Sequence, residues 1–150
     1  MSQVFIGYDT YNMEGVDDEL IRFIFDVTLG LTTKKMDSEV GLILSKSDQM
    51  QQLNQRYLGH DRPTNVLSFT DQAISGEKHL ATTDANYLGD IYIGVEVLEK
   101  EAQELKISEK ERFVQLFVHG LLHLLGWDHV TSVQAAEMEE LEDQIVQLVV

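Results

Sequence analysis

Apolar residues recur along the chain with two spacings, every second residue in some segments and every third or fourth in others. These spacings predict strands and helices, respectively. Compact or alternating apolar runs of strand length occupy residues 3–8, 40–45, 65–70 and 88–94. Apolar residues spaced three and four apart predict five helices, which start near residues 17–18, 47, 95, 108 and 131–132. The strand over residues 65–70 follows Pro63 and is expected at or near the edge of the sheet. Residues 71–86 follow neither period, and a loop of that length in a compact domain is typically mobile or functional.

Polar caps and glycines mark the ends of these helices. The expected caps are Asp17 or Asp18, Ser108, and Thr131 or Ser132, and Ser47 is expected to open the second helix. The expected stops are Gly30, Gly59 and Gly126. Ser108 with Glu111, and Thr131 with Gln134, have the spacing of a capping box. Gly120 lies inside the fourth helix, where glycine costs about 1 kcal/mol relative to alanine. Its presence predicts that another element approaches the helix backbone closely at this point.

The composition describes an ordinary globular protein with a single domain over residues 1–150. A chain of this length buries roughly 68–70% of its unfolded surface on folding. A hydrophobic content of 43% and a single proline are not typical of disordered or fibrous chains. The N-terminus lacks the basic flank and the long apolar run of a signal peptide, and no window is long enough to span a membrane. We therefore expect a cytoplasmic protein.

Cysteine usage and net charge narrow the chemistry. The chain has no cysteine, which rules out disulfides and thiolate ligands, so any metal must be held by histidine or carboxylate. The formal net charge of −15 disfavours indiscriminate binding to nucleic acid, because Lys and Arg supply most of that affinity. A local basic groove remains compatible with this charge. Acidic runs such as residues 137–143 are typical of solvated helix faces.

Three of the five histidines lie at fixed offsets around the end of the fourth predicted helix. His119 and His123 are four residues apart, so their imidazoles lie one turn apart on one face of the helix. Gly126 ends the helix, and His129 returns from the following loop. Such a trio can hold one metal ion and leave the fourth corner of a zinc tetrahedron for water. The alternative, three ordinary core histidines, is disfavoured because burying unpaired imidazoles costs on the order of 1–3 kcal/mol each.

The offsets match the H-E-x-x-H-x-x-G-x-x-H zinc pattern with one difference, because Gly120 replaces the glutamate. In proteases with that pattern the glutamate is the general base, so peptide hydrolysis by that route is disfavoured. Phosphodiester hydrolysis needs less help from a side chain, because a metal lowers the pKa of bound water to about 7 and stabilises charge on a phosphoryl oxygen. Asp128 is the candidate catalytic residue, and capping the next helix is an equally good role for it.

Three blocks of sequence have a distinctive order and spacing. They are residues 53–57 (LNQRY) continuing to residues 61–69 (DRPTNVLSF), residues 88–91 (LGDI), and residues 119–129 (HGLLHLLGWDH). With these blocks the chain resembles the YbeY family of metal-dependent endoribonucleases, which act in ribosomal RNA maturation. The histidine block is highly distinctive, and the other two support it.

The resemblance implies an α+β fold in which about five helices pack on a central four-stranded mixed sheet, with a zincin-like metal helix. It implies one zinc ion per chain, held by His119, His123 and His129. It also implies cleavage of single-stranded RNA at the 3′ end of 16S ribosomal RNA, by attack of metal-activated water on a phosphodiester, in ribosome maturation and quality control. The expected partners are ribosomal RNA and the ribosome.

One position departs from the family pattern. The family motif continues with an arginine after Tyr57, near the metal cleft, and this chain has Leu58 there. An arginine is the natural partner of a phosphate, so RNA cleavage requires that Arg56 or Arg62 reach the same space. These two are the candidate substrate-binding residues, and the alternative is that both are solvent-exposed charges. Ser68 and Asp90 also match the family without being assigned catalytic roles, and His60 and His79 are expected at the surface.

Two other functions remain open. One is a non-catalytic, ribosome-associated factor with a structural zinc, which Leu58 and the acidic balance favour. The other is a zinc hydrolase of another substrate. A fourth protein ligand on the metal would favour the structural role, and an open coordination position would favour an enzyme.

Overall fold

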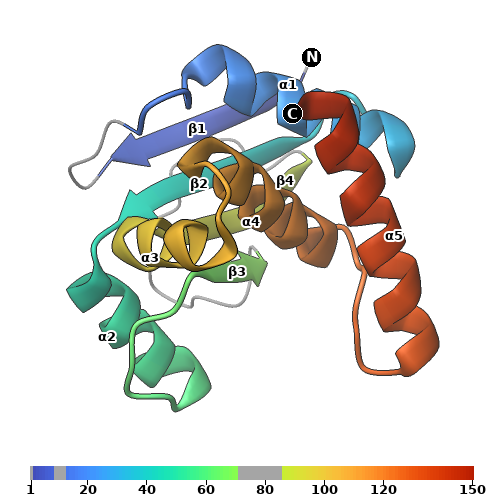
Figure 1. Cartoon of the computed structure of the whole chain (residues 1–150). Coiled ribbons are helices and arrows are strands. Elements are labelled where there is room, and N and C mark those ends of the chain that lie inside the picture. The colour runs from blue at the N-terminus through green and yellow to red at the C-terminus, as the bar shows by residue number, and fades with distance from the viewer. Residues whose placement is uncertain (1, 9–12, 71–85) are drawn as a thin grey trace.

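A sheet surrounded by helices forms the centre of the molecule, which we describe from a computed structural model over residues 2–8, 13–70 and 86–150. Figure 1 shows the helices packed around the strands, with the last helix at one side, in contact with the first and fourth helices. Within this part of the chain the elements are β1 (Gln3–Tyr8), α1 (Asp18–Leu31), β2 (Glu39–Ser45), α2 (Ser47–Leu58), β3 (Val66–Thr70), β4 (Tyr87–Gly94), α3 (Val95–Leu105), α4 (Glu109–Leu124) and α5 (Ser132–Val149).

The strands lie in the order β1-β2-β4-β3. β1 pairs with β2 and β2 pairs with β4 in parallel, whereas β3 pairs with β4 in the antiparallel direction. The mixed four-stranded sheet and the five helices predicted from the sequence are confirmed over the described residues, and so is the edge position of the third strand. The predicted loop over residues 71–86 lies outside the described residues, apart from Asn86.

The main core lies between the central strands and α4. Leu42 of β2 and Ile91 of β4 share one buried cluster with Phe113 and Phe117 of α4. Eight residues of α4 are buried, against two of α5, so α4 is the enclosed helix and α5 lies at the margin. No helix in the described ranges is long and apolar enough to cross a membrane.

A smaller apolar cluster lies on the other face of β3. Met50 of α2 packs there with Leu67 and Phe69, and the ring of Tyr57 lies 5.2 Å from that of Phe69, centroid to centroid. Because side chains alternate along a strand, Ser68 points the opposite way, toward α4. The edge strand β3 therefore lies between α2 and α4.

Most helix ends match the sequence predictions. Asp17 accepts the N–H of Leu20 at 2.8 Å, Gly59 closes α2 with φ of 76°, and Thr131 with Gln134 forms a capping box. The stop predicted at Gly30 is wrong, because α1 continues to Leu31. Gly30 keeps a negative φ, and the helix ends instead through Lys34, which has φ of 60° and donates its N–H to the Leu29 carbonyl oxygen at 2.8 Å. A glycine in the sequence therefore indicates a helix end only where its backbone adopts a positive φ, as at Gly59 and not at Gly30.

Gly120 confirms that another element approaches α4 closely. A Cβ at this position would lie 3.0 Å from Cγ2 of Ile91 and 3.0 Å from Oγ of Ser68. The Ser68 hydroxyl donates to the Gly120 carbonyl oxygen at 3.3 Å. Glycine therefore allows α4 to pack directly against β3 and β4, and Ser68 satisfies a backbone group in this contact.

We predict that Gly120→Ala lowers the free energy of unfolding by about 1–3 kcal/mol, the usual cost of overpacking, although alanine favours a helix by about 1 kcal/mol. Gly30→Ala is the matched control, because no atom lies within 4 Å of a Cβ built at that helical glycine. It should raise the free energy of unfolding by about 0.4–1 kcal/mol. Denaturant unfolding measures both changes, and equal effects would contradict the close packing at Gly120.

Candidate metal centre

α4 presents His119 and His123 on one face, one turn apart. Their ring centroids are 4.5 Å apart, and their Nε2 atoms are 3.0 Å apart. Ser108 caps the first turn of this helix by accepting the N–H of Glu111 at 3.0 Å. Both imidazoles are half-buried while the helix around them is enclosed, so the core holds the two rings in place.

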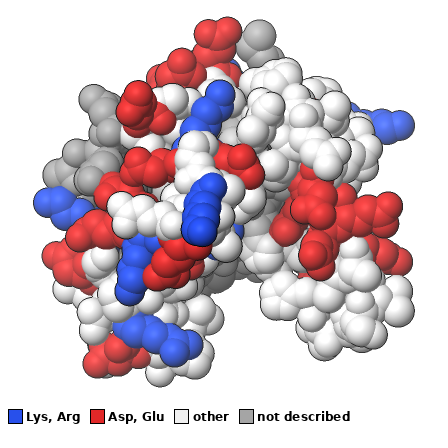
Figure 2. All heavy atoms as spheres, viewed as in Figure 1, with Lys and Arg blue, Asp and Glu red and all other residues white. Residues whose placement is uncertain are grey.

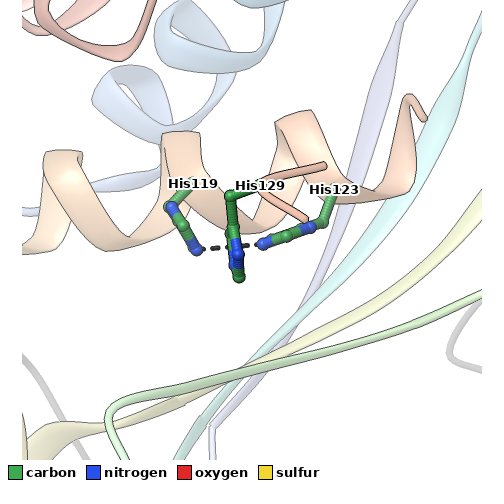
Figure 3. A group of neighbouring side chains, drawn as sticks. All are labelled: His119, His123 and His129. Atoms are coloured by element: carbon green, nitrogen blue, oxygen red, sulfur yellow. Dashed lines mark hydrogen bonds between the residues drawn. The ribbon is translucent and has the colours of Figure 1, made fainter. Parts of the chain in front are cut away.

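A tight turn after α4 brings the third imidazole back to the first two. Gly126 donates its N–H to the His123 carbonyl oxygen at 3.1 Å. Its φ of 97° is a left-handed conformation that glycine adopts at little cost, as its position in the sequence predicts. The centroid of the His129 ring then lies 5.1 Å from that of His123 and 6.0 Å from that of His119. Figure 3 shows the three rings turned toward one another beside α4.

The three rings are compatible with one shared metal ion. One nitrogen from each of His119, His123 and His129 lies within 4.8 Å of the others. Nitrogen ligands placed about 2.0–2.1 Å from a tetrahedral zinc are ~3.3 Å from one another. The 3.0 Å between the Nε2 atoms of the two helical histidines is close to that separation. The trio is therefore compatible with one cation bound between the three rings.

Hydrogen bonds to two of the rings favour the same conclusion. Glu142 of α5 bonds to Nδ1 of His119, and a carboxylate can only accept, so Nδ1 carries the proton. The backbone of Trp127 hydrogen-bonds the His123 ring in a way that raises its pKa, as expected when the ring donates. With its proton held on Nδ1, His119 has its lone pair on Nε2, the nitrogen that faces Nε2 of His123 inside the trio.

Glu142 is a site residue that the sequence did not single out, because the acidic run over residues 137–143 is typical of a solvated face. One signal was present in the pattern. Glu142 follows Met138 by four residues and precedes Ile145 by three, and both of these residues are buried. A carboxylate on the inner side of a helix needs a partner, and here the partner is His119.

The three histidines line a cleft of about 680 Å³. Its other walls come from the end of α2, with Tyr57 and Leu58, and from residues 65–69 at and before β3. A second groove of about 660 Å³ runs between α4 and α5 and also reaches His119 and His129. Its lining includes four carboxylates, and Figure 2 shows acidic side chains gathered over α5 beside this hollow. The histidine trio thus borders an apolar cleft on one side and an acidic groove on the other.

The remaining candidate residues, Asp128, Arg56 and Arg62, do not line the cleft. Leu58 lines the cleft, but Arg56 and Arg62 are not among its lining residues. The guanidinium of Arg56 lies 5.2 Å from the centroid of the Tyr57 ring. Asp128 lies in a separate hollow and accepts the N–H of His129 at 2.7 Å. The roles assigned to Asp128, Arg56 and Arg62 stay predictions.

Two further residues considered in the sequence, Asp90 and His60, have no part in the trio. Asp90 is buried in β4 and accepts the hydroxyl of Tyr87, which is a structural contact. His60 is exposed at the end of α2, as expected. His79 lies outside the described residues.

The electrostatics of the trio favour a neutral imidazole at its centre. Burial lowers the pKa of His123 below its ordinary value, and the charges that His119 and His129 carry when protonated lower it further. Asp128 and the Trp127 backbone act in the opposite direction. The neutral form is the one that binds a metal, so this environment prepares His123 as a ligand.

Comparisons with known proteins identify similar chains. A sequence model of the family described as Endoribonuclease YbeY matches residues 9–149. A protein of that name from Acinetobacter baumannii is 42% identical over 127 residues, which cover 84% of this chain and 79% of that protein. Another from Francisella philomiragia is 39% identical over 110 residues, which cover 73% and 68%. A solution structure of a Thermotoga maritima protein matches with a TM-score of 0.62 and 28% identity, over 99% of this chain and 89% of that one.

We predict that, in protein treated with a chelator, lowering the pH from about 7.5 to about 5.5 reduces the free energy of unfolding through His123. The pKa of this ring in the folded chain lies below the value of ~6.5 in the unfolded chain. The unfolded state therefore takes up a proton first, and stability is lost as the pH falls through the unfolded value. His123→Gln removes this contribution, so its unfolding free energy should fall less over the same range. Denaturant unfolding at both pH values measures the difference, and a steeper fall in the variant would contradict the assignment.

Proposed function

The chain belongs to the YbeY family of endoribonucleases, and on this premise we propose that it is a zinc-dependent hydrolase of single-stranded RNA. In this proposal it acts in the cytoplasm on the 3′ end of 16S ribosomal RNA, in ribosome maturation and quality control, with the ribosome as its partner. The observation that carries the proposal is the convergence of three imidazoles on one cleft. A catalytic zinc site usually has three ligands from the protein, and three histidines are one such set.

The composition of the trio favours an open metal site. Among the described residues no further His, Asp or Glu joins His119, His123 and His129 as a ligand group, which leaves one corner of a tetrahedron for water. These three residues would hold a zinc ion, which when bound would lower the pKa of water and stabilise negative charge on a phosphoryl oxygen. The protein's own contribution is to hold the three rings rigidly, through the enclosed helix α4 and the turn at Gly126.

The cleft wall suits single-stranded RNA. Tyr57, Leu58 and Phe69 line the cleft with aromatic and apolar surface, on which an unstacked base can pack. Bases inside a duplex are stacked on one another and do not present their faces to such a wall. The net charge of −15 disfavours tracking of the RNA backbone along the whole surface, so recognition is concentrated at this cleft.

One observation favours a different function. Leu58 lines the cleft at the position where the family pattern has an arginine, so one expected phosphate contact is missing. A ribosome-associated factor with a structural zinc would tolerate this change, whereas a nuclease would lose transition-state stabilisation. Hydrolysis of a different substrate at the same zinc is the third candidate, and Gly120 in place of a glutamate argues against peptides.

We predict that the zinc-loaded protein cleaves a single-stranded RNA oligonucleotide and leaves the same sequence intact when it is annealed to its complement. His119→Ala should reduce cleavage to background, because a zinc ligand is lost. His60→Ala is the control, since this histidine is exposed and lies outside the cleft, and it should cleave as the wild type does. Equal cleavage by wild type and His119→Ala would indicate a contaminating nuclease, and no cleavage by the wild type would favour the binding factor.

We predict that Leu58→Arg raises kcat/KM on RNA by about 10–150-fold, because a charge-assisted hydrogen bond to a phosphate contributes about 1.5–3 kcal/mol. Leu105→Arg at the end of α3 is the matched control, since it adds the same charge at an exposed leucine outside the cleft. Single-turnover cleavage assays on both variants separate a local contact from a general gain in charge. A similar gain from both substitutions would contradict the role of position 58.

A further inference from the structure

We propose that Glu142 is a positioning residue that holds His119 in the tautomer and orientation needed to bind the metal. This inference deepens the proposed metal site and rests on its assignment. The contact that carries it is the bond between the Glu142 carboxylate and Nδ1 of His119, which joins α5 to α4. It makes the last helix part of the metal centre, although its residues contribute no ligand to the trio.

The packing of α5 explains why Glu142 reaches this ring. Met138 and Ile145 are buried on either side of it along the helix, so the inner face of α5 is set against α4. Glu142 lies on this face and is half-buried, with 23% of its side chain exposed, while the His119 side chain is 32% exposed. The bond is therefore partly shielded from water, which strengthens it relative to a surface pair.

The chemistry of the bond selects one of the two neutral forms of His119. An ionised carboxylate has no proton to donate, so the ring nitrogen that it contacts must be the protonated one. The neutral imidazole then carries its lone pair on Nε2. Nε2 is also the atom that lies 3.0 Å from Nε2 of His123, inside the trio. The carboxylate therefore directs the free lone pair toward the place where a metal would be bound.

The other acidic residues of the groove do not have this role. Glu139 and Asp143 also line the groove between α4 and α5, but both are exposed, and Glu111, the fourth carboxylate, lies in the first turn of α4, two turns before His119. Within the described ranges, Glu142 is the carboxylate that bonds a ring of the trio from behind. Outer partners of this kind orient the ligand and increase its basicity, and their removal typically lowers metal affinity about 10–100-fold.

The test measures zinc affinity by competition with a chromophoric chelator and reads the His119 tautomer from long-range ¹H–¹⁵N NMR spectra of the metal-free protein. Glu142→Ala should weaken zinc binding about 10–100-fold and abolish the preference for a proton on Nδ1. Glu142→Gln keeps an oxygen acceptor, so it should retain the tautomer and lose less affinity. Glu140→Ala removes an exposed carboxylate of the same helix outside the groove, and both readouts should stay at wild-type values.

Wild-type affinity in Glu142→Ala, or an unchanged tautomer, would overturn the inference. Circular dichroism tests whether the alanine variant is folded, and if it is not, the glutamine variant decides: a loss of the Nδ1 proton in that variant contradicts the inference. These outcomes are independent of the proposed RNA cleavage. A wild type that binds zinc and shows the effect of Glu142 but cuts no RNA would refute the nuclease proposal alone.

Discussion

The packing of α4 against the sheet is the constraint on which the site depends. Two imidazoles one turn apart share a metal only when the helix that carries them is rigid and correctly rotated. Gly120 fixes the position and rotation of α4, because the absence of a Cβ lets the helix lie directly on Ile91 and Ser68. In this position His119 and His123 face the edge of the sheet. The same rotation of α4 places both rings beside β3. The packing of α4 on the sheet therefore also determines where the cleft lies.

The parts of the site that depend on local sequence could be predicted, and the parts that depend on tertiary contacts could not. The approach of His119, His123 and His129 depends only on local structure, namely one turn of helix and the turn at Gly126. The structure places the three rings together. The four strands follow in the same way from short apolar runs, and the edge position of β3 follows from Pro63 just before it. Glu142 reaches His119 from another helix, 23 residues away in the sequence, and no local period shows such a contact. The helix end predicted at Gly30 was wrong for a different reason. The rule that a glycine ends a helix was applied at a glycine that keeps a negative φ, so α1 continues past it.

The charges of the molecule limit how it can act on RNA. The chain has a formal net charge of −15, and carboxylates lie over α5 on one side of the trio, so in the proposed function RNA would approach through the cleft that the three histidines share with α2 and β3. That cleft presents apolar and aromatic side chains, including Leu58 where the family pattern has arginine. Stacking of bases and charge stabilisation by a metal would then carry more of the recognition than phosphate contacts do. Glu142 fits this arrangement, because its negative charge is directed to the back of a metal ligand and away from the substrate side.

The most direct measurement of the central claim is X-ray absorption at the zinc edge on the purified protein, combined with the metal content per chain. We expect about one zinc per chain with three imidazole nitrogens at about 2.0–2.1 Å and one oxygen from water. Substitution of His123 by alanine should abolish that signal. A fourth protein ligand in place of water would contradict a catalytic site, and the absence of stoichiometric zinc in protein loaded with the metal would contradict the site itself.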